Sequence, residues 1–378
     1  MFRKTAFSSI LALTASLAVA ACSMNADTSD AAERVELTTF AELSDTRPGN
    51  IAVLPEGRVI LTQQPLDNPE LRVVELKADG TKAPFPTLDW ADGPEKGEVG
   101  FAATLGIKSD SNGVVWILDM GGGSTNPQLV GWDTNTDALV KTIEIPAETV
   151  TPVSFLQDFV LDEERGKAYI SDMTFTAPVS DLKPAFIVVD LETGEARRVL
   201  ESAAELMPAE TDVVVGDQLV GFKDEEGNPQ PWHLPFNALS IDPDFEYVYF
   251  GTINGSDVMR IPAEGLANTT EAQGDADQAA LAASIERYAQ KAPNDGFIVD
   301  REGRVYSGDV TTNALTVSTP DSFEVFAKDD KRLRWPDGFT FGPDGTLYVV
   351  ASQLNTHPAL NMGKDDSDKP YYILTVKP

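Results

Sequence analysis

The segment PFNALSIDPDFEYVYFGTING, residues 235–255, contains two short apolar runs joined by a tight turn. The first run follows the polar residue Asn237, and the second is rich in aromatic and β-branched residues. Two such runs around a turn predict a β-hairpin. The position of a polar amide at the start of an apolar strand needs an explanation. The same pattern recurs along the chain, and this repetition suggests one.

Five other segments repeat this unit of strand, turn and strand. They are GNIAVLPEGRVILT (49–62), LGIKSDSNGVVWILD (105–119), QDFVLDEERGKAYISD (157–172), NDGFIVDREGRVYSGD (294–309) and PDGFTFGPDGTLYVVAS (336–352). Six copies of one hairpin predict an all-β fold, a six-bladed β-propeller. A sandwich of two sheets is the alternative architecture, but it does not require six copies of one hairpin.

The turns and the chain ends add detail to this prediction. PEGR, SNGV, REGR and PDGT place a glycine where the backbone needs a positive φ. The strand-like segments at 34–43 and 371–378 lie at opposite ends of the domain, and we expect them to share the last blade, because this removes open sheet edges.

One segment, residues 263–291, departs from the β pattern. It is rich in Ala, Glu and Gln, and Leu281, Ile285 and Tyr288 recur at helical spacing. We therefore expect a partly helical insertion between the fourth and fifth blades, with the helix toward its end.

The N-terminus reads as an export signal. Residues 1–21 contain a basic start and an apolar run, and VAAC places Cys22 after small residues, as in bacterial lipoprotein signals. We expect lipidated Cys22, a flexible tether over 22–33 and a propeller over 34–378, held in the cell envelope as an outer-membrane lipoprotein facing the periplasm, or extracellular. An ordinary cleaved signal is the alternative. Cys22 is the single cysteine, so no intramolecular disulfide can form.

The charge balance limits the partners. A formal net charge of −31 repels nucleic acid phosphates, so we expect no nucleic acid partner. The membrane is expected to be a partner only through the lipid anchor, and the protein is expected to be a monomer.

The ordered series GVVWILDMGG, PQLVGWDTNTDALVKTIEIP, FLQDFVLDEERGKAYISD, FIVVDLETGEARRVL and RWPDGFTFGPDGTLYVVASQLN resembles the major royal jelly protein/yellow family. The resemblance runs from about Arg34 to the C-terminus and implies a six-bladed propeller with a small-molecule site at its central channel. More distantly, the pattern is similar to gluconolactonase/regucalcin-type propellers. That likeness implies a metal site of Glu, Asn and Asp, for which Asn237 and Asp295 match the Asn and Asp, while Asn50 stands in place of the Glu.

The starts of the predicted inner strands supply a set of polar residues around the axis. These candidate ligand-binding residues are Asn50, Gln157, Asp158, Asn237, Asn294, Asp295 and Asp337, and Leu105 interrupts the ring. Their oxygen atoms suit Ca²⁺ or another divalent cation. The alternative is that they cap turns through local side-chain hydrogen bonds.

His233 and Trp232, which precede Asn237 in the chain, complete the candidate site. Histidine is a residue type suited to act as a general base near neutral pH, so Asp295 and His233 are the candidate catalytic residues. Trp232 is a candidate for stacking against a ligand. Three hypotheses stay open: a small-molecule binding protein, a metal-dependent lactonase- or esterase-like hydrolase, and a protein-interaction scaffold. Only the second of them is an enzyme.

Overall fold

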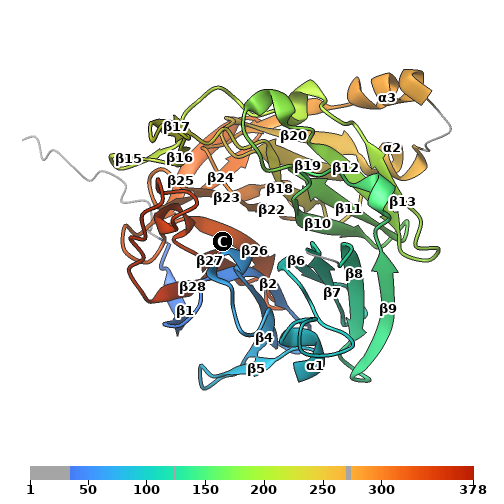
Figure 1. Cartoon of the computed structure of the whole chain (residues 1–378), viewed down its shortest axis with the longest axis vertical. Coiled ribbons are helices and arrows are strands. Elements are labelled where there is room, and N and C mark those ends of the chain that lie inside the picture. Colours follow the sequence, from blue (N-terminus) through green and yellow to red (C-terminus); the bar gives the residue numbers. More distant parts are fainter. Residues whose placement is uncertain (1–34, 123–124, 270–273) are drawn as a thin grey trace, which may run out of the picture. The chain divides into compact units, whose positions relative to one another are not determined.

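The computed structural model describes residues 35–122, 125–269 and 274–378. Six four-stranded antiparallel sheets surround a central axis, which is the six-bladed β-propeller predicted from the repeats (Figure 1). The expected signal at 1–21, Cys22 and the tether at 22–33 lie outside the described residues. Among the described helices, none is long and apolar enough to cross a membrane.

Each repeated hairpin forms the two inner strands of one blade. The innermost strands are β2 (Pro48–Val53), β6 (Thr104–Ser109), β10 (Leu156–Asp162), β18 (Phe236–Ile241), β22 (Phe297–Val299) and β26 (Pro336–Phe341). The second strands are β3 (Val59–Gln63), β7 (Val114–Asp119), β11 (Lys167–Asp172), β19 (Tyr247–Thr252), β23 (Val305–Asp309) and β27 (Leu347–Ala351). Each innermost strand contacts the innermost strands of the blades on both sides, so the ring is closed.

The outer half of each blade follows the same order. The third strands are β4 (Val73–Leu76), β8 (Gln128–Asp133), β12 (Ala185–Asp190), β20 (Asp257–Pro262), β24 (Ala314–Thr319) and β28 (Tyr371–Val376). The outermost strands are β5 (Lys82–Pro84), β9 (Ala138–Glu144), β13 (Ala196–Val199), β21 (Glu286–Gln290), β25 (Ser322–Lys328) and β1 (Thr38–Leu43). Because β1 pairs with β28, the first and last described strands belong to the sixth blade, as predicted.

The hydrophobic core lies between neighbouring blades. Between blades three and four, Phe186, Phe236 and Phe250 are fully buried, and the rings of Phe186 and Phe236 lie 4.4 Å apart. Aromatic side chains on the pleated faces thus supply both packing area and ring contacts. Phe236 is therefore a core residue, although it precedes Asn237 directly.

Residues 263–291 contain helices, but the helices do not lie toward the end of the segment, and the segment lies within blade four and not between blades four and five. Two helices form, α2 (Ala263–Asn268) and α3 (Gly274–Ala282), but residues 286–290 form β21, the outermost strand of blade four. The Tyr288 hydroxyl donates to the Gly303 carbonyl at 2.7 Å, and Glu286 pairs with Arg260. Strand pairing with β20 and these contacts outweigh the helical spacing of the apolar residues.

Smaller elements decorate the ring. They are helix α1 (Leu88–Ala91), the hairpins β14 (Val214–Val215) with β15 (Gln218–Leu219) and β16 (Gly221–Lys223) with β17 (Pro229–Pro231), and the 3₁₀ turns η1 (Pro65–Asp67), η2 (Ala147–Thr149), η3 (Val179–Asp181), η4 (Ala204–Leu206) and η6 (Leu354–Thr356). The Gly221 amide donates to the Leu360 carbonyl at 2.9 Å, and the Trp232 indole donates to the Ala359 carbonyl at 2.9 Å. These bonds hold the connection between blades three and four against the segment that follows η6.

The glycines of the repeated turns adopt positive φ, as predicted. Gly57, Gly113, Gly303 and Gly345 have φ values of 84°, 82°, 76° and 77°. The corresponding turn of blade four uses Phe245 at φ 56° instead. A side chain at these positions is strained, because the left-handed region brings Cβ close to the following carbonyl.

Replacing Gly345 tests this backbone requirement, because a Cβ added there meets no atom within 4 Å. Gly345→Ala is expected to lower the free energy of unfolding by about 1 kcal/mol, from backbone strain alone. Gly345→Asn is the control and should cost less, since Asn tolerates the left-handed region. Urea unfolding measures both, and equal stability of Gly345→Ala and the native protein would contradict the argument.

Candidate functional site

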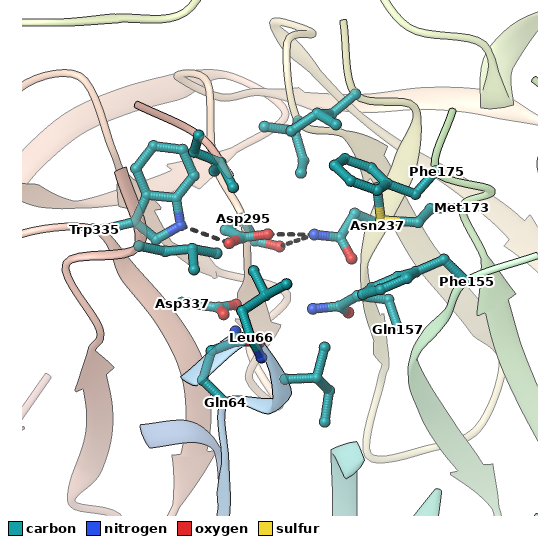
Figure 2. A pocket seen from close by; sticks show the side chains of 15 residues that line it. Gln64, Leu66, Phe155, Gln157, Met173, Phe175, Asn237, Asp295, Trp335 and Asp337 are labelled. Carbon is teal, nitrogen blue, oxygen red and sulfur yellow. Dashed lines mark hydrogen bonds between the residues drawn. The ribbon is translucent and has the colours of Figure 1, made fainter. Parts of the chain in front are cut away.

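A pocket lies at the end of the channel where the innermost strands begin (Figure 2). Its cavity volume is about 90 Å³, enough for a few water-sized groups or one end of a small ligand. The lining residues are Gln64, Leu66, Leu105, Phe155, Gln157, Met173, Phe175, Leu234, Asn237, Ile253, Asp295, Trp335, Asp337, Leu354 and Leu360. Most of them are apolar, and the polar ones come mainly from the predicted ring.

A repeated irregularity accompanies the strand starts that supply this lining. In five blades the register between the innermost and second strands shifts immediately after the strand begins. The shifted stretches contain Asn50, Leu105, Gln157, Asn237 and Asp337. A β-bulge re-aims the side chain it contains, so the position of Asn237 reflects the bulge as well as the strand end.

Asp295 lies at the centre of the polar floor, just before β22. Its Oδ2 accepts a hydrogen bond from Trp335 Nε1 at 2.6 Å, and its Oδ1 accepts one from Asn237 Nδ2. Figure 2 shows the two donors reaching Asp295 from opposite sides. Asn237 Oδ1 is buried and accepts no hydrogen bond from any described residue. The floor therefore holds one fixed carboxylate and one unsatisfied acceptor.

The backbone of Trp335 is itself unusual. Trp335 is 1% exposed and has a φ of 54°, in the left-handed region that bulky residues avoid. This conformation directs a large side chain toward Asp295. Strain of this kind persists where the surrounding structure fixes it, and it concentrates at functional sites.

Asp337 is the second carboxyl group of the floor, and it is buried beside Asp295. Burial and then the charges of Asp295 and Asp158 raise its pKa well above the ordinary value, while Lys108 lowers it. Burial also raises the pKa of Asp295 to about 6, against its hydrogen bonds with Trp335 and Asn237. Two carboxyl groups so close and so buried favour retention of a proton near neutral pH.

The apolar wall continues into a series of aromatic rings. Phe155 and Phe175 line the pocket with ring centroids 5.8 Å apart. The Trp232 ring lies 4.5 Å from that of Phe175 and 4.2 Å from that of Phe222 in β16. Trp232 thus supports the wall from behind, and it does not itself line the pocket.

Four other candidate residues make local contacts and do not line the pocket. Asn50 Oδ1 accepts from the Ile51 amide, and Asn294 Nδ2 donates to the Gly296 carbonyl. Asp158 pairs with Lys108 at 2.9 Å. His233 Nε2 lies 2.9 Å from Asp212 Oδ1, so its ring contacts a loop carboxylate. For Asn50 and Asn294 the local hydrogen bonds match the capping alternative.

The pair expected to hold a divalent cation does not fit one as it is arranged. Both oxygens of Asp295 accept hydrogen bonds from N–H donors, and Asn237 turns its nitrogen toward Asp295. In the described ranges, no group of three or more His, Cys, Asp or Glu side chains could hold a metal ion. A Ca²⁺ site needs six or more converging oxygens, about twice what these residues provide.

Sequence reasoning missed the lining residues that come from connections. Gln64 and Leu66 come from the segment around η1, and Leu354 and Leu360 from the segment around η6. No repeat marks these segments. Arg47 could have indicated the first segment, because this buried arginine forms an ion pair with Asp67 in η1.

A model of the major royal jelly protein family matches residues 103–377, so the chain belongs to that family, and the resemblance found in the sequence is confirmed. No curated protein matches the chain.

Solved structures show the same fold. The chain is similar to a gluconolactonase from Xanthomonas campestris, with 13% identity, TM-score 0.52 and 90% of each chain covered. It is also similar to a calcium-binding protein, regucalcin, from Agrobacterium tumefaciens, with 15% identity, TM-score 0.54, and 91% of this chain and 95% of that chain covered. At these identities the likeness concerns the fold alone.

The raised pKa values predict a pH-dependent stability. Asp337→Asn removes one carboxyl group that favours protonation in the folded state. A raised folded pKa stabilises at low pH and loses that contribution as pH rises through it. The variant should therefore gain stability relative to the native protein as the pH rises above the ordinary pKa range of a carboxyl group. Thermal unfolding at several pH values measures the difference.

Asp321→Asn is the control, because Asp321 is exposed on the outer part of blade five. Its stability relative to the native protein should not change with pH in this range. A constant difference between Asp337→Asn and the native protein would contradict the raised pKa.

Proposed function

We propose that this member of the major royal jelly protein family binds a small molecule with an apolar body and a hydrogen-bonding end in the channel pocket. The observation that carries the proposal is Asn237 Oδ1, a buried acceptor without a described partner at the floor of an otherwise apolar pocket. A buried polar atom left unpaired costs about 1–3 kcal/mol, which a donor on a ligand recovers.

The distribution of polar and apolar groups supports this kind of ligand. Phe155, Met173 and Phe175 offer apolar area on one side of the pocket. Asp337 lies on the other side and is 8% exposed. Among the described residues, none donates a hydrogen bond to its carboxyl group. Binding sites typically combine such an apolar lining with a few polar groups that fix orientation.

A second candidate function is hydrolysis of a lactone or ester. The feature that favours it is Asp337, a carboxyl group whose raised pKa suits proton transfer and which lies beside the fixed carboxylate of Asp295. In this scheme Asp295 accepts a proton from the attacking water as the water oxygen bonds to the carbonyl carbon, and Asp337 donates a proton to the leaving oxygen as the C–O bond breaks. His233, which contacts Asp212, takes no part in it.

We also propose that the protein acts in the cell envelope as an exported lipoprotein and as a monomer. The export and the lipid anchor rest on residues 1–21 and Cys22 of the sequence. The remaining hypothesis is a protein-interaction scaffold. A protein that neither binds the probes nor hydrolyses a lactone would favour this hypothesis.

Ligand binding is tested with two ring-bearing probes of similar size, p-cresol and benzylamine, which differ in the charge of the polar end. A bound probe at about 100 times its Kd should stabilise the protein by about 2.7 kcal/mol in thermal unfolding. Phe175→Ala should weaken binding about tenfold through loss of wall area. Val325→Ala, at an exposed side chain of β25, is the control and should bind normally.

The same preparations separate the candidates. Stabilisation without product supports a binding protein, whereas turnover of a δ-lactone that Asp337→Asn abolishes supports the hydrolase. Each assay is run with added Ca²⁺ and with chelator, so that a cation requirement would be seen. Probe binding that Phe175→Ala leaves unchanged would refute the pocket as the site.

A further inference from the structure

Lys291, which follows β21, carries a buried amine. Its side chain is 2% exposed, and Nζ donates to the carbonyl oxygens of Thr252 at 2.7 Å, Gly255 at 2.6 Å and Ala292 at 3.4 Å. Within the described ranges, no carboxylate lies within ion-pair distance of it, although Asp257 acts on it through its charge. The three donors of the ammonium group are thus matched by three backbone acceptors.

Burying this group without a carboxylate is costly. Desolvation disfavours the charged form and lowers the pKa of Lys291 to about 7. An apolar side chain of similar length would avoid that cost but would remove the ammonium donor from both carbonyls, of which only that of Thr252 also accepts from the Gly255 amide, at 3.2 Å. The bonds to those carbonyls are therefore what distinguishes Lys291 from a packing residue.

The two segments that Lys291 joins both carry pocket residues. The segment after β19, residues 252–255, contains Ile253, which lines the pocket, and Asn254, whose Oδ1 accepts from the Leu234 amide at 2.7 Å. The segment after β21 leads from Lys291 through Asn294 to Asp295. The Asn294 amide also donates to the Ile253 carbonyl at 3.1 Å, so the segments run side by side.

We propose that Lys291 is a positioning residue of the pocket, because its ammonium group holds the segment of Ile253 against the segment that ends at Asp295. The proposal rests on the proposed function only where it concerns ligand affinity. Gly251 supports it independently, since a Cβ at Gly251 would lie 2.8 Å from Lys291 Cε. The glycine leaves the room through which the lysine side chain reaches the carbonyls.

The first test needs no ligand. The Trp335 indole N–H donates to Asp295 at 2.6 Å, so its resonance in a ¹H–¹⁵N spectrum reports the position of the Asp295 carboxylate. The chain has five tryptophans, and Trp335→Phe identifies the peak. Lys291→Met is expected to move this resonance, whereas the core variant Val74→Ala, which lowers stability far from the pocket in blade one, should leave it in place. An unmoved resonance in folded Lys291→Met would overturn the proposal.

A second variant covers the case in which Lys291→Met does not fold. Gly251→Ala keeps the charge and displaces the lysine side chain, so a smaller shift of the same Trp335 resonance is expected. Folded Gly251→Ala with the native resonance would equally count against the proposal.

Affinity for p-cresol then separates this inference from the proposed function. Lys291→Met should bind p-cresol about tenfold more weakly than the native protein and than Val74→Ala. Native affinity in Lys291→Met would overturn the positioning role. A shifted Trp335 resonance together with no p-cresol binding by the native protein would uphold the positioning role and overturn the proposed function.

Discussion

The pairing of β1 with β28 is the constraint on which the rest of the structure depends. It joins the first described strand to the last in one blade, from Thr38↔Thr375 to Leu43↔Tyr371. The buried Arg47 strengthens the same junction: its Nε donates to the Ser352 carbonyl at 2.8 Å, and its guanidinium lies 4.9 Å from the Tyr371 ring centroid. Six strand starts converge on one axis only in a closed ring, so closure comes before any site at the channel. Through the ion pair with Asp67, Arg47 also fixes the turn that brings Leu66 to the pocket.

Closure alone does not direct polar side chains to the axis, and the β-bulges at the strand starts provide that step. Each bulge breaks the alternation of its strand, and in four blades the residue in the bulge lines the pocket: Leu105, Gln157, Asn237 and Asp337. The resulting collection of carboxyl groups is electrostatically unfavourable. Trp335 and Asn237 donate hydrogen bonds to Asp295, Lys108 pairs with Asp158, and Asp337 accommodates the remaining charge through a raised pKa. The repulsion between these carboxyl groups is thus reduced in three ways: hydrogen bonds to Asp295, an ion pair with Asp158 and a raised pKa at Asp337.

Much of the fold could be predicted from the sequence, since six hairpins with glycine turns are a local signal that recurs. Only part of the site could be predicted from the sequence. Gln157, Asn237, Asp295 and Asp337 could be found, because the repeat places them at equivalent positions. Asn50 occupies an equivalent position, yet its amide is used locally, and nothing in the repeat distinguishes the two cases. Leu354, Leu360 and the role of Lys291 depend on contacts between segments far apart in the chain. The strand β21 was missed because its place at a blade edge outweighs its local helical spacing.

The pocket is asymmetric although the ring is not, and this asymmetry bears on ligand recognition. Blade three and the connections supply Phe155, Phe175 and Leu360, whereas Asp295 and Asp337 come from blades five and six. A ligand in the pocket would therefore direct its polar end toward Asn237, Asp295 and Asp337 of blades four to six and its apolar body toward blade three. The blade repeat alone would give a symmetric channel, so the direction of binding depends on the residues that depart from the repeat. For this reason, the propeller fold shared with lactonase- and regucalcin-like structures says little about the ligand. The pocket side chains of this chain say more.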